Sequence, residues 1–195
     1  MFEIEIKAWL DNPSETEQIL YSFADYKGES FKSDVYWYNK ERNVKIRIRE
    51  EKLISETNTE KNTIYVTGKI KTVSEGIEIN SENEFQISDK SAFELFLNQA
   101  GFFLQSAKTK TSKNFYAQNC HIELVSVDGI GQFIEIEILS SSNEPSVVEQ
   151  NRSILMSILG KCHIPEKNIE PRFYSFLQEH KINSKNRLSF PCNKP

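Results

Sequence analysis

Residues 2–9 read FEIEIKAW, and apolar and charged side chains alternate from Phe2 to Ala8. Successive side chains of a β-strand point to opposite faces of the sheet. Glu3, Glu5 and Lys7 therefore share one face, and the apolar residues between them share the other. The stretch predicts a strand with one charged face and one apolar face, and the apolar face needs cover from other parts of the chain.

The same alternation recurs along the chain and predicts eight strands rich in Ile, Val, Phe and Tyr. They are Phe2–Trp9, Ser33–Tyr38, Val44–Glu50, Asn62–Ile70, Gly76–Ile87, Phe103–Ala117, His121–Val127 and Gln132–Leu139. Capping residues, prolines and glycines predict helices at about 13–26, 89–100 and 145–159, and a short helix after Pro171. Many strands with few helices favour an α+β fold, mainly β, built on a closed antiparallel sheet.

The charged faces of these strands are sorted by sign. Each set carries one sign: Glu82/Glu84 and Glu135/Glu137 are acidic, and Lys45/Arg47/Arg49, Lys69/Lys71 and Lys108/Lys110 are basic. Ordinary solvated faces are one interpretation, because half-exposed strands commonly carry charge. The sorting favours another, an eight-stranded antiparallel closed barrel whose charges point inward and whose apolar outside is covered by helices.

The chain has 195 residues, with 24 Lys or Arg and 28 Asp or Glu, so its formal net charge is −4. This length suits one domain, which we expect at residues 1–180, followed by a polar tail at 181–195. The net charge argues against nonspecific binding of nucleic acid, which needs a basic surface. No apolar run approaches about 18 residues, so we expect no transmembrane helix and no membrane partner.

The opening segment MFEIEIK lacks the basic start and apolar stretch of a secretory leader, which predicts a cytoplasmic location. The three cysteines, Cys120, Cys162 and Cys192, include no CxxC pair. This spacing favours reduced thiols over a disulfide framework or a zinc site.

An inward-facing set of charges needs a ligand, because buried charge is costly unless it is paired. Carboxylate oxygens suit Mg²⁺ or Mn²⁺, and clustered Arg and Lys suit phosphate oxygens. The chain contains neither GxxxxGK[ST] nor GxGxxG. Side chains rather than a glycine-rich loop must therefore hold the phosphates, and a metal-bound polyphosphate would match both sets of charges.

The segment Glu3–Lys7 resembles the ExExK motif of the CYTH superfamily, the triphosphate tunnel metalloenzymes that include class IV adenylyl cyclases and thiamine triphosphatases. The similarity continues in order over about residues 2–178, through Asp34–Tyr36, Arg47–Arg49, Thr67–Lys69, Lys108–Lys110, Gly129–Glu137 and Glu170–Tyr174. The last two segments are most similar to the class IV adenylyl cyclase branch.

The resemblance implies a role for each matching residue. Divalent metal, Mg²⁺ or Mn²⁺, would bind to Glu3, Glu5 and Glu135, with Glu137 assisting. The triphosphate would bind to Lys7, Arg47, Arg49, Lys69, Lys108 and Lys110, of which Lys7, Arg49 and Lys69 are the candidate catalytic residues. We expect the carboxylates of Glu3, Glu5 and Glu135 to converge within metal-bridging reach inside the barrel.

Three positions depart from the family pattern. Val125 stands where the family usually has Asp, which puts a second metal or the activation of the nucleophile in doubt. Tyr38 stands where Asp is frequent, and Lys110 stands where Arg is common, which would lose a bidentate contact. Glu123 shares the strand face of Val125 and is a candidate replacement.

Three functions remain open. The first is a metal-dependent enzyme on ATP, thiamine triphosphate or tripolyphosphate, with cyclase favoured slightly over triphosphatase. The second is a non-catalytic triphosphate- or nucleotide-binding module, and the third is a barrel for another ligand or a partner protein. The sequence leaves a homodimer open, since barrels can associate through their outer strands or helices.

Overall fold

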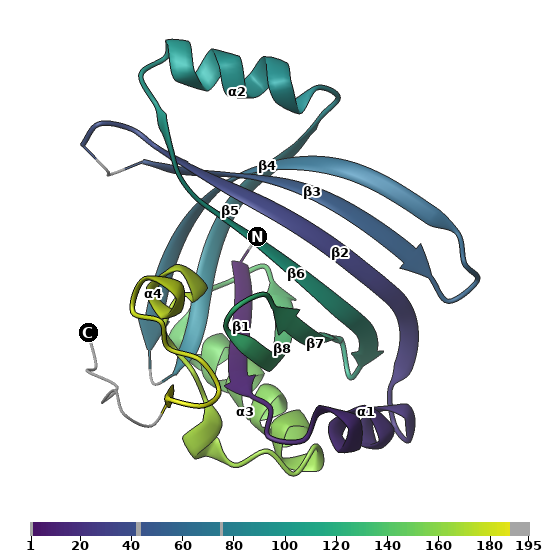
Figure 1. The fold of residues 1–195 in the computed structure, drawn as a ribbon. Helices are drawn as coiled ribbons and strands as arrows, with labels where there is room; N and C mark the ends of the chain where they lie inside the picture. Colours follow the sequence, from purple (N-terminus) through teal and green to yellow (C-terminus); the bar gives the residue numbers. More distant parts are fainter. Residues whose placement is uncertain (1, 42–43, 75, 188–195) are drawn as a thin grey trace.

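The computed structural model describes residues 2–41, 44–74 and 76–187, without the side chains at 69–72, 74 and 82 (Figure 1). Eight strands lie within these residues: β1 (Phe2–Trp9), β2 (Asp25–Tyr38), β3 (Lys45–Ser55), β4 (Glu60–Ser74), β5 (Ile77–Ile87), β6 (Phe103–Ala117), β7 (Cys120–Val127) and β8 (Gly131–Ser140). The helices are α1 (Pro13–Tyr21), α2 (Lys90–Gln99), α3 (Pro145–Lys161), α4 (Tyr174–Glu179) and a 3₁₀ turn, η1 (Glu166–Asn168).

The strands form a closed barrel in the order β1-β5-β4-β3-β2-β6-β7-β8. Every neighbouring pair is antiparallel, and the ring closes because β1 pairs with both β5 and β8. The first strand sets the register at this closure, where Glu5 lies opposite Glu78 on one side and Glu137 on the other. The predicted eight-stranded antiparallel barrel with helices outside is confirmed.

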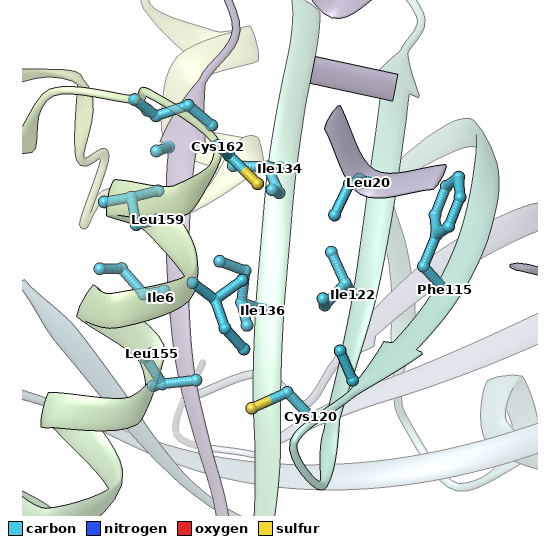
Figure 2. Packing of buried hydrophobic residues seen from close by; sticks show 14 of the residues in the cluster. Ile6, Leu20, Phe115, Cys120, Ile122, Ile134, Ile136, Leu155, Leu159 and Cys162 are labelled. Carbon is cyan, nitrogen blue, oxygen red and sulfur yellow. The ribbon is translucent and has the colours of Figure 1, made fainter. Parts of the chain in front are cut away.

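Helices cover the apolar outer face of the barrel in two places. On one side, α1 and α3 pack on β1, β6, β7 and β8. Ile6 and Ile136 of the barrel lie there in one cluster with Leu155 and Leu159 of α3 (Figure 2). On the opposite side, α2 places Leu97 over the outer face of β2, β3 and β4 (Figure 1). With the apolar face covered from outside, the charged face of each strand is left to line the interior.

One end of the barrel interior is filled by apolar side chains. Trp9 packs against Phe133 in a tilted arrangement with ring centroids 4.2 Å apart, and Phe133 contacts Tyr174 edge-on with ring centroids 4.9 Å apart. Val125 and Leu177 complete this cluster with a few neighbours. We call this cluster the apolar plug; it separates the charged interior from that end of the barrel.

The described residues after Lys181 also contact the barrel. Ile182 is buried in the apolar plug, and the amide of Ser184 donates a hydrogen bond to the carbonyl of Ile130 at 3.2 Å. Arg187 pairs with Asp11 at 2.5 Å. The predicted domain boundary at residue 180 stays a prediction, and residues 188–195 lie outside the described residues.

The largest difference from the predicted elements lies between α1 and β2. The helix ends at Tyr21 rather than Tyr26, and β2 begins at Asp25, eight residues before the predicted start at Ser33. Gly28 explains the difference, because it marks a β-bulge with φ of 110°. A Cβ there would lie 2.0 Å from the carbonyl oxygen of Ile54. A glycine at a bulge interrupts the alternation that reveals a strand.

The end of α3 was also predicted too early. The helix passes through Gly160 and ends at Lys161, because Ile158 and Leu159 pack against the barrel. Tertiary packing outweighs the small helix cost of one glycine. Among the described helices, none combines the length and the hydropathy needed to cross a bilayer.

Candidate functional site

The barrel encloses a cavity of about 560 Å³ lined by side chains from all eight strands and from the start of α4. Nine of the ten predicted site residues line it: Glu3, Glu5, Lys7, Arg47, Arg49, Lys108, Lys110, Glu135 and Glu137. The tenth is Lys69, whose backbone pairs with Glu82 in the sheet and whose side chain lies outside the described residues. Residues up to about 130 positions apart in the sequence thus meet in one charged cavity, although their individual roles stay predictions.

Arg49 and Asp34 form a bidentate ion pair in the cavity wall. Arg49 donates from Nε to Oδ1 of Asp34 at 2.7 Å and from Nη2 to Oδ2 at 2.9 Å. Asp34 is 0% exposed, and Tyr36 donates a third hydrogen bond to it at 3.2 Å. Burial alone would raise the pKa of Asp34, but the charge and hydrogen bonds of Arg49 hold that pKa well below its usual range.

Lys108 lies beside this pair, with Nζ 3.6 Å from Oδ2 of Asp34. Its ammonium is 5.4 Å from the ring centre of Tyr36 and 4.7 Å from that of Tyr174. Burial lowers the pKa of Lys108 to about 7, against the attraction of Asp34 and with help from neighbouring positive charges. Lys108 is therefore close to half-protonated at neutral pH when the cavity is empty.

A second network joins β6, β7 and β8. Lys110 donates to Oε2 of Glu135 at 2.7 Å and lies 3.9 Å from Glu123. Lys32 donates to the other oxygen of Glu123 at 2.5 Å. Burial alone would raise the pKa values of Glu135 and Glu123, but the adjacent lysines lower both. The carboxylates are therefore ionised at neutral pH.

Lys7 holds the segment at residues 170–173, which precedes α4, against the cavity. Lys7 donates from Nζ to the carbonyl of Arg172 at 2.7 Å and lies 3.6 Å from Glu78. Glu170 accepts from Trp9 Nε1 at 3.0 Å and from Arg172 Nε at 2.6 Å. These contacts fix the segment that carries Tyr174 into the cavity.

Four residues that contact the predicted site were given no role by the sequence: Lys32, Asp34, Glu78 and Tyr174. Strand alternation could have identified Lys32, because it shares its strand face with Asp34 and Tyr36. It was missed because the predicted strand begins one residue later, at Ser33. Tyr174 had no such signal, because it comes from a helix that packs against the barrel.

Val125 faces the apolar plug rather than the charged cavity and is 2% exposed. Glu123, two residues earlier on the same strand face, lines the cavity. A carboxylate on β7 is therefore present in the cavity, displaced by one inward-facing position from the family pattern.

The expected convergence of Glu3, Glu5 and Glu135 into a formed metal cluster is not observed. Among residues 2–41, 44–74 and 76–187, no three His, Cys, Asp or Glu side chains are arranged to hold a metal ion. The reason at Glu135 is that Lys110 and Tyr174 occupy its two oxygens.

The donor chemistry still fits a hard divalent cation. The candidate ligands offer carboxylate oxygens, which Mg²⁺ and Mn²⁺ prefer. Glu123 lies opposite Glu135 in the register, and its buried Oε2 accepts no hydrogen bond. A cation would supply the partner that this oxygen lacks, although it would have to displace ion pairs with lysine.

Comparison with known proteins assigns the family. The family model of the CYTH domain matches residues 1–174. The chain belongs to the CYTH family. Its barrel is therefore a CYTH triphosphate tunnel, as the predicted resemblance implied.

Solved structures share this CYTH fold. A conserved hypothetical protein from Pyrococcus furiosus is 25% identical, with a TM-score of 0.73 over 90% of this chain and 99% of that one. A proposed adenylate cyclase from Vibrio parahaemolyticus is 17% identical, with a TM-score of 0.76 over 92% and 98%.

A third structure, a proposed adenylyl cyclase from Hippeastrum with a dominant triphosphatase activity, is also 17% identical. Its TM-score is 0.64 over 92% of this chain and 96% of that one. At these identities the Vibrio and Hippeastrum structures show the fold alone. A search of curated protein sequences returns no match for this CYTH chain.

Proposed function

We propose that this CYTH protein is a divalent-metal-dependent enzyme that binds one triphosphate in its tunnel and acts as a class IV adenylyl cyclase, converting ATP to cyclic AMP and pyrophosphate. The observation that carries the proposal is the cavity of about 560 Å³, in which described cations and carboxylates from seven of the eight strands face one another. A soluble nucleotide substrate fits the predicted cytoplasmic location.

The cations of the tunnel would hold the phosphate chain. Arg47 and Arg49 each present a planar guanidinium, which suits bidentate contact with phosphate oxygens. Lys7 from β1 and Lys108 and Lys110 from β6 add compact charges on other parts of the same cavity lining. Because these cations are already held by nearby carboxylates, they are ordered before the substrate arrives, and pre-ordered charge is effective in catalysis.

Glu3, Glu5, Glu135 and Glu137 would hold the cation. Bound Mg²⁺ or Mn²⁺ would neutralise phosphate charge and ease deprotonation of the attacking hydroxyl. In the cyclase reaction the ribose 3′-oxygen forms a bond to the α-phosphorus, the α–β bridging bond breaks, and pyrophosphate leaves. The protein's residues contribute position and charge rather than a covalent intermediate.

A triphosphatase is the second candidate, and the dominant triphosphatase activity of the Hippeastrum relative favours it. In that reaction water attacks the terminal phosphorus of ATP, thiamine triphosphate or tripolyphosphate, the bridging bond to that phosphorus breaks, the diphosphate leaves, and orthophosphate is formed. The same cations would serve, since both reactions place a triphosphate along the tunnel. The two activities differ in which phosphorus lies next to the nucleophile.

Product analysis separates these functions. The purified chain is incubated with ATP, thiamine triphosphate or tripolyphosphate, each with Mg²⁺ and with Mn²⁺. Cyclic AMP with pyrophosphate supports the cyclase, and orthophosphate supports the triphosphatase. Tight binding without any product would contradict an enzyme and support a binding module. Absence of binding for all three compounds would contradict the tunnel function itself.

A further inference from the structure

Glu135 accepts hydrogen bonds from two donors that lie in the same cavity but come from different elements of the fold. Tyr174, from α4, donates its hydroxyl to Oε1 at 2.6 Å. Lys110, from β6 on the inner wall, donates to Oε2 at 2.7 Å. Both oxygens of a predicted metal ligand are therefore occupied when the tunnel is empty, and any cation at Glu135 must share or displace one donor.

Tyr174 is the fixed donor of the two. It is 7% exposed, and its ring packs on Phe133 in the apolar plug at a centroid distance of 4.9 Å. Its helix is anchored by Leu177 in the same cluster, and the preceding segment is held by Lys7 at the carbonyl of Arg172. A rigid neutral donor of this kind orients a ligating carboxylate without competing for charge.

Lys110 is the exchangeable donor. Its ammonium ends a flexible four-carbon chain, and Glu123 lies 3.9 Å away as a second partner. A divalent ion and an ammonium group on the same carboxylate oxygen repel each other at short range, so binding of the first weakens the hold on the second. A divalent ion bound to Oε2 of Glu135 would therefore release Lys110, with its charge, into the cavity where the triphosphate is proposed to lie.

We infer that Tyr174 is the positioning residue for Glu135 and that Lys110 transfers from Glu135 to the triphosphate when the metal binds. The inference rests on the proposed function and adds an order of binding events to it. The metal frees Lys110 to bind phosphate, and by linkage the bound phosphate keeps Lys110 away from Glu135, the metal ligand. Metal and triphosphate thus favour each other's binding through one ion pair.

Titration of the full chain with Mn²⁺ in the absence of phosphate tests the roles of Tyr174 and Lys110. The electron paramagnetic resonance signal of free Mn²⁺ measures how much of the ion is bound. Tyr174→Phe keeps the ring and removes the hydroxyl, so Mn²⁺ binding should weaken about tenfold or more. Lys110→Met removes the competing donor, so Mn²⁺ binding should tighten about fivefold or more. Lys113→Met removes the same charge from the same strand, where Lys113 pairs with Glu17 at 2.6 Å and does not line the cavity, and is the matched control, with little expected change.

A second arm measures tripolyphosphate binding by calorimetry, with chelator and as the preformed Mg²⁺ complex. Lys110→Met should weaken binding more strongly for the Mg²⁺ complex, because only there is Lys110 free to contact phosphate. Equal weakening in both conditions would contradict the transfer. Circular dichroism and thermal melting of each variant establish that it is folded.

The outcomes separate this inference from the proposed function. If the unaltered chain binds Mn²⁺ but Tyr174→Phe leaves that affinity unchanged, or Lys110→Met shifts it no more than Lys113→Met does, this inference is wrong while the proposed function stands. If the unaltered chain binds no Mn²⁺ at all, the metal part of the proposed function fails and this inference fails with it.

Discussion

Arg49 donates two parallel hydrogen bonds of 2.7 and 2.9 Å to Asp34, whose side chain in the tunnel wall is 0% exposed. This pair fixes one of the predicted phosphate-binding cations before any ligand arrives. It also ties β2 to β3 at the register pair Asp34–Arg49. The pair therefore links the stability of the barrel to the geometry of the site.

Removing Asp34 should be costly, because it leaves the charge of Arg49 buried with too little compensation. We expect Asp34→Ala to lower the free energy of unfolding by about 3–5 kcal/mol, measured by urea denaturation. The exposed pair Lys52–Glu60, at 2.8 Å, provides the comparison. Glu60→Ala should cost no more than about 1 kcal/mol. Similar small losses for both variants would show that the buried pair does not support the fold.

Lys108 should make triphosphate binding depend on pH. Its pKa of about 7 in the empty tunnel lies below the ordinary value of 10.5. Bound phosphate favours the charged ammonium, so binding raises that pKa and takes up a proton. Affinity is then greatest below pH 7 and falls as pH rises above it, by up to about tenfold per pH unit.

Calorimetry of tripolyphosphate binding in buffers of different ionisation enthalpy measures this proton uptake directly. Lys108→Arg keeps the positive charge at every accessible pH and should remove the protein's share of the uptake, leaving only that of the ligand. Identical uptake in the two proteins would mean that Lys108 is already fully protonated in the empty tunnel.

Val125 belongs to the apolar plug, so restoring the family's usual Asp at this position should fail to build a metal ligand. We expect Val125→Asp to destabilise the chain by about 3–5 kcal/mol at neutral pH, because an unpaired charge enters the interior. Burial raises the pKa of such a carboxyl above the ordinary Asp value of about 3.9, so the loss should shrink as pH falls from 7 toward about 4, below which the carboxyl is neutral in both the folded and the unfolded chain. Val125→Thr, of similar shape, is the control. Tighter Mn²⁺ binding by a fully stable Val125→Asp protein would refute this assignment.

The barrel and most of its inner wall were predictable because strand parity is a local property. Once Phe2–Trp9 is recognised as an alternating strand, the faces of Glu3, Glu5 and Lys7 follow, and the same reasoning applies to Arg47 and Arg49. The glycine bulge in β2 hid Lys32 from this reasoning, because it broke the pattern at Gly28.

The contacts of the site were not predictable in the same way. Tyr174 reaches Glu135 from a helix 39 positions away, and no periodicity connects the two. The ion pair of Lys110 with Glu135 also depends on barrel curvature, since the register pairs Lys110 with Val127. Parity says which way a side chain faces, whereas its partner depends on how the sheet closes.

The central claim is that one triphosphate binds among the inward-facing cations of the tunnel. Calorimetric titration of the full chain with the preformed Mg²⁺–tripolyphosphate complex tests it most directly. We predict one binding site and a loss of about tenfold to hundredfold in affinity for Arg47→Met, since each hydrogen bond to a charged group contributes about 1.5–3 kcal/mol. Lys52→Met, which removes the same charge from the exposed pair with Glu60, should bind like the unaltered chain. Absence of binding, or equal affinity for all three proteins, would contradict the account.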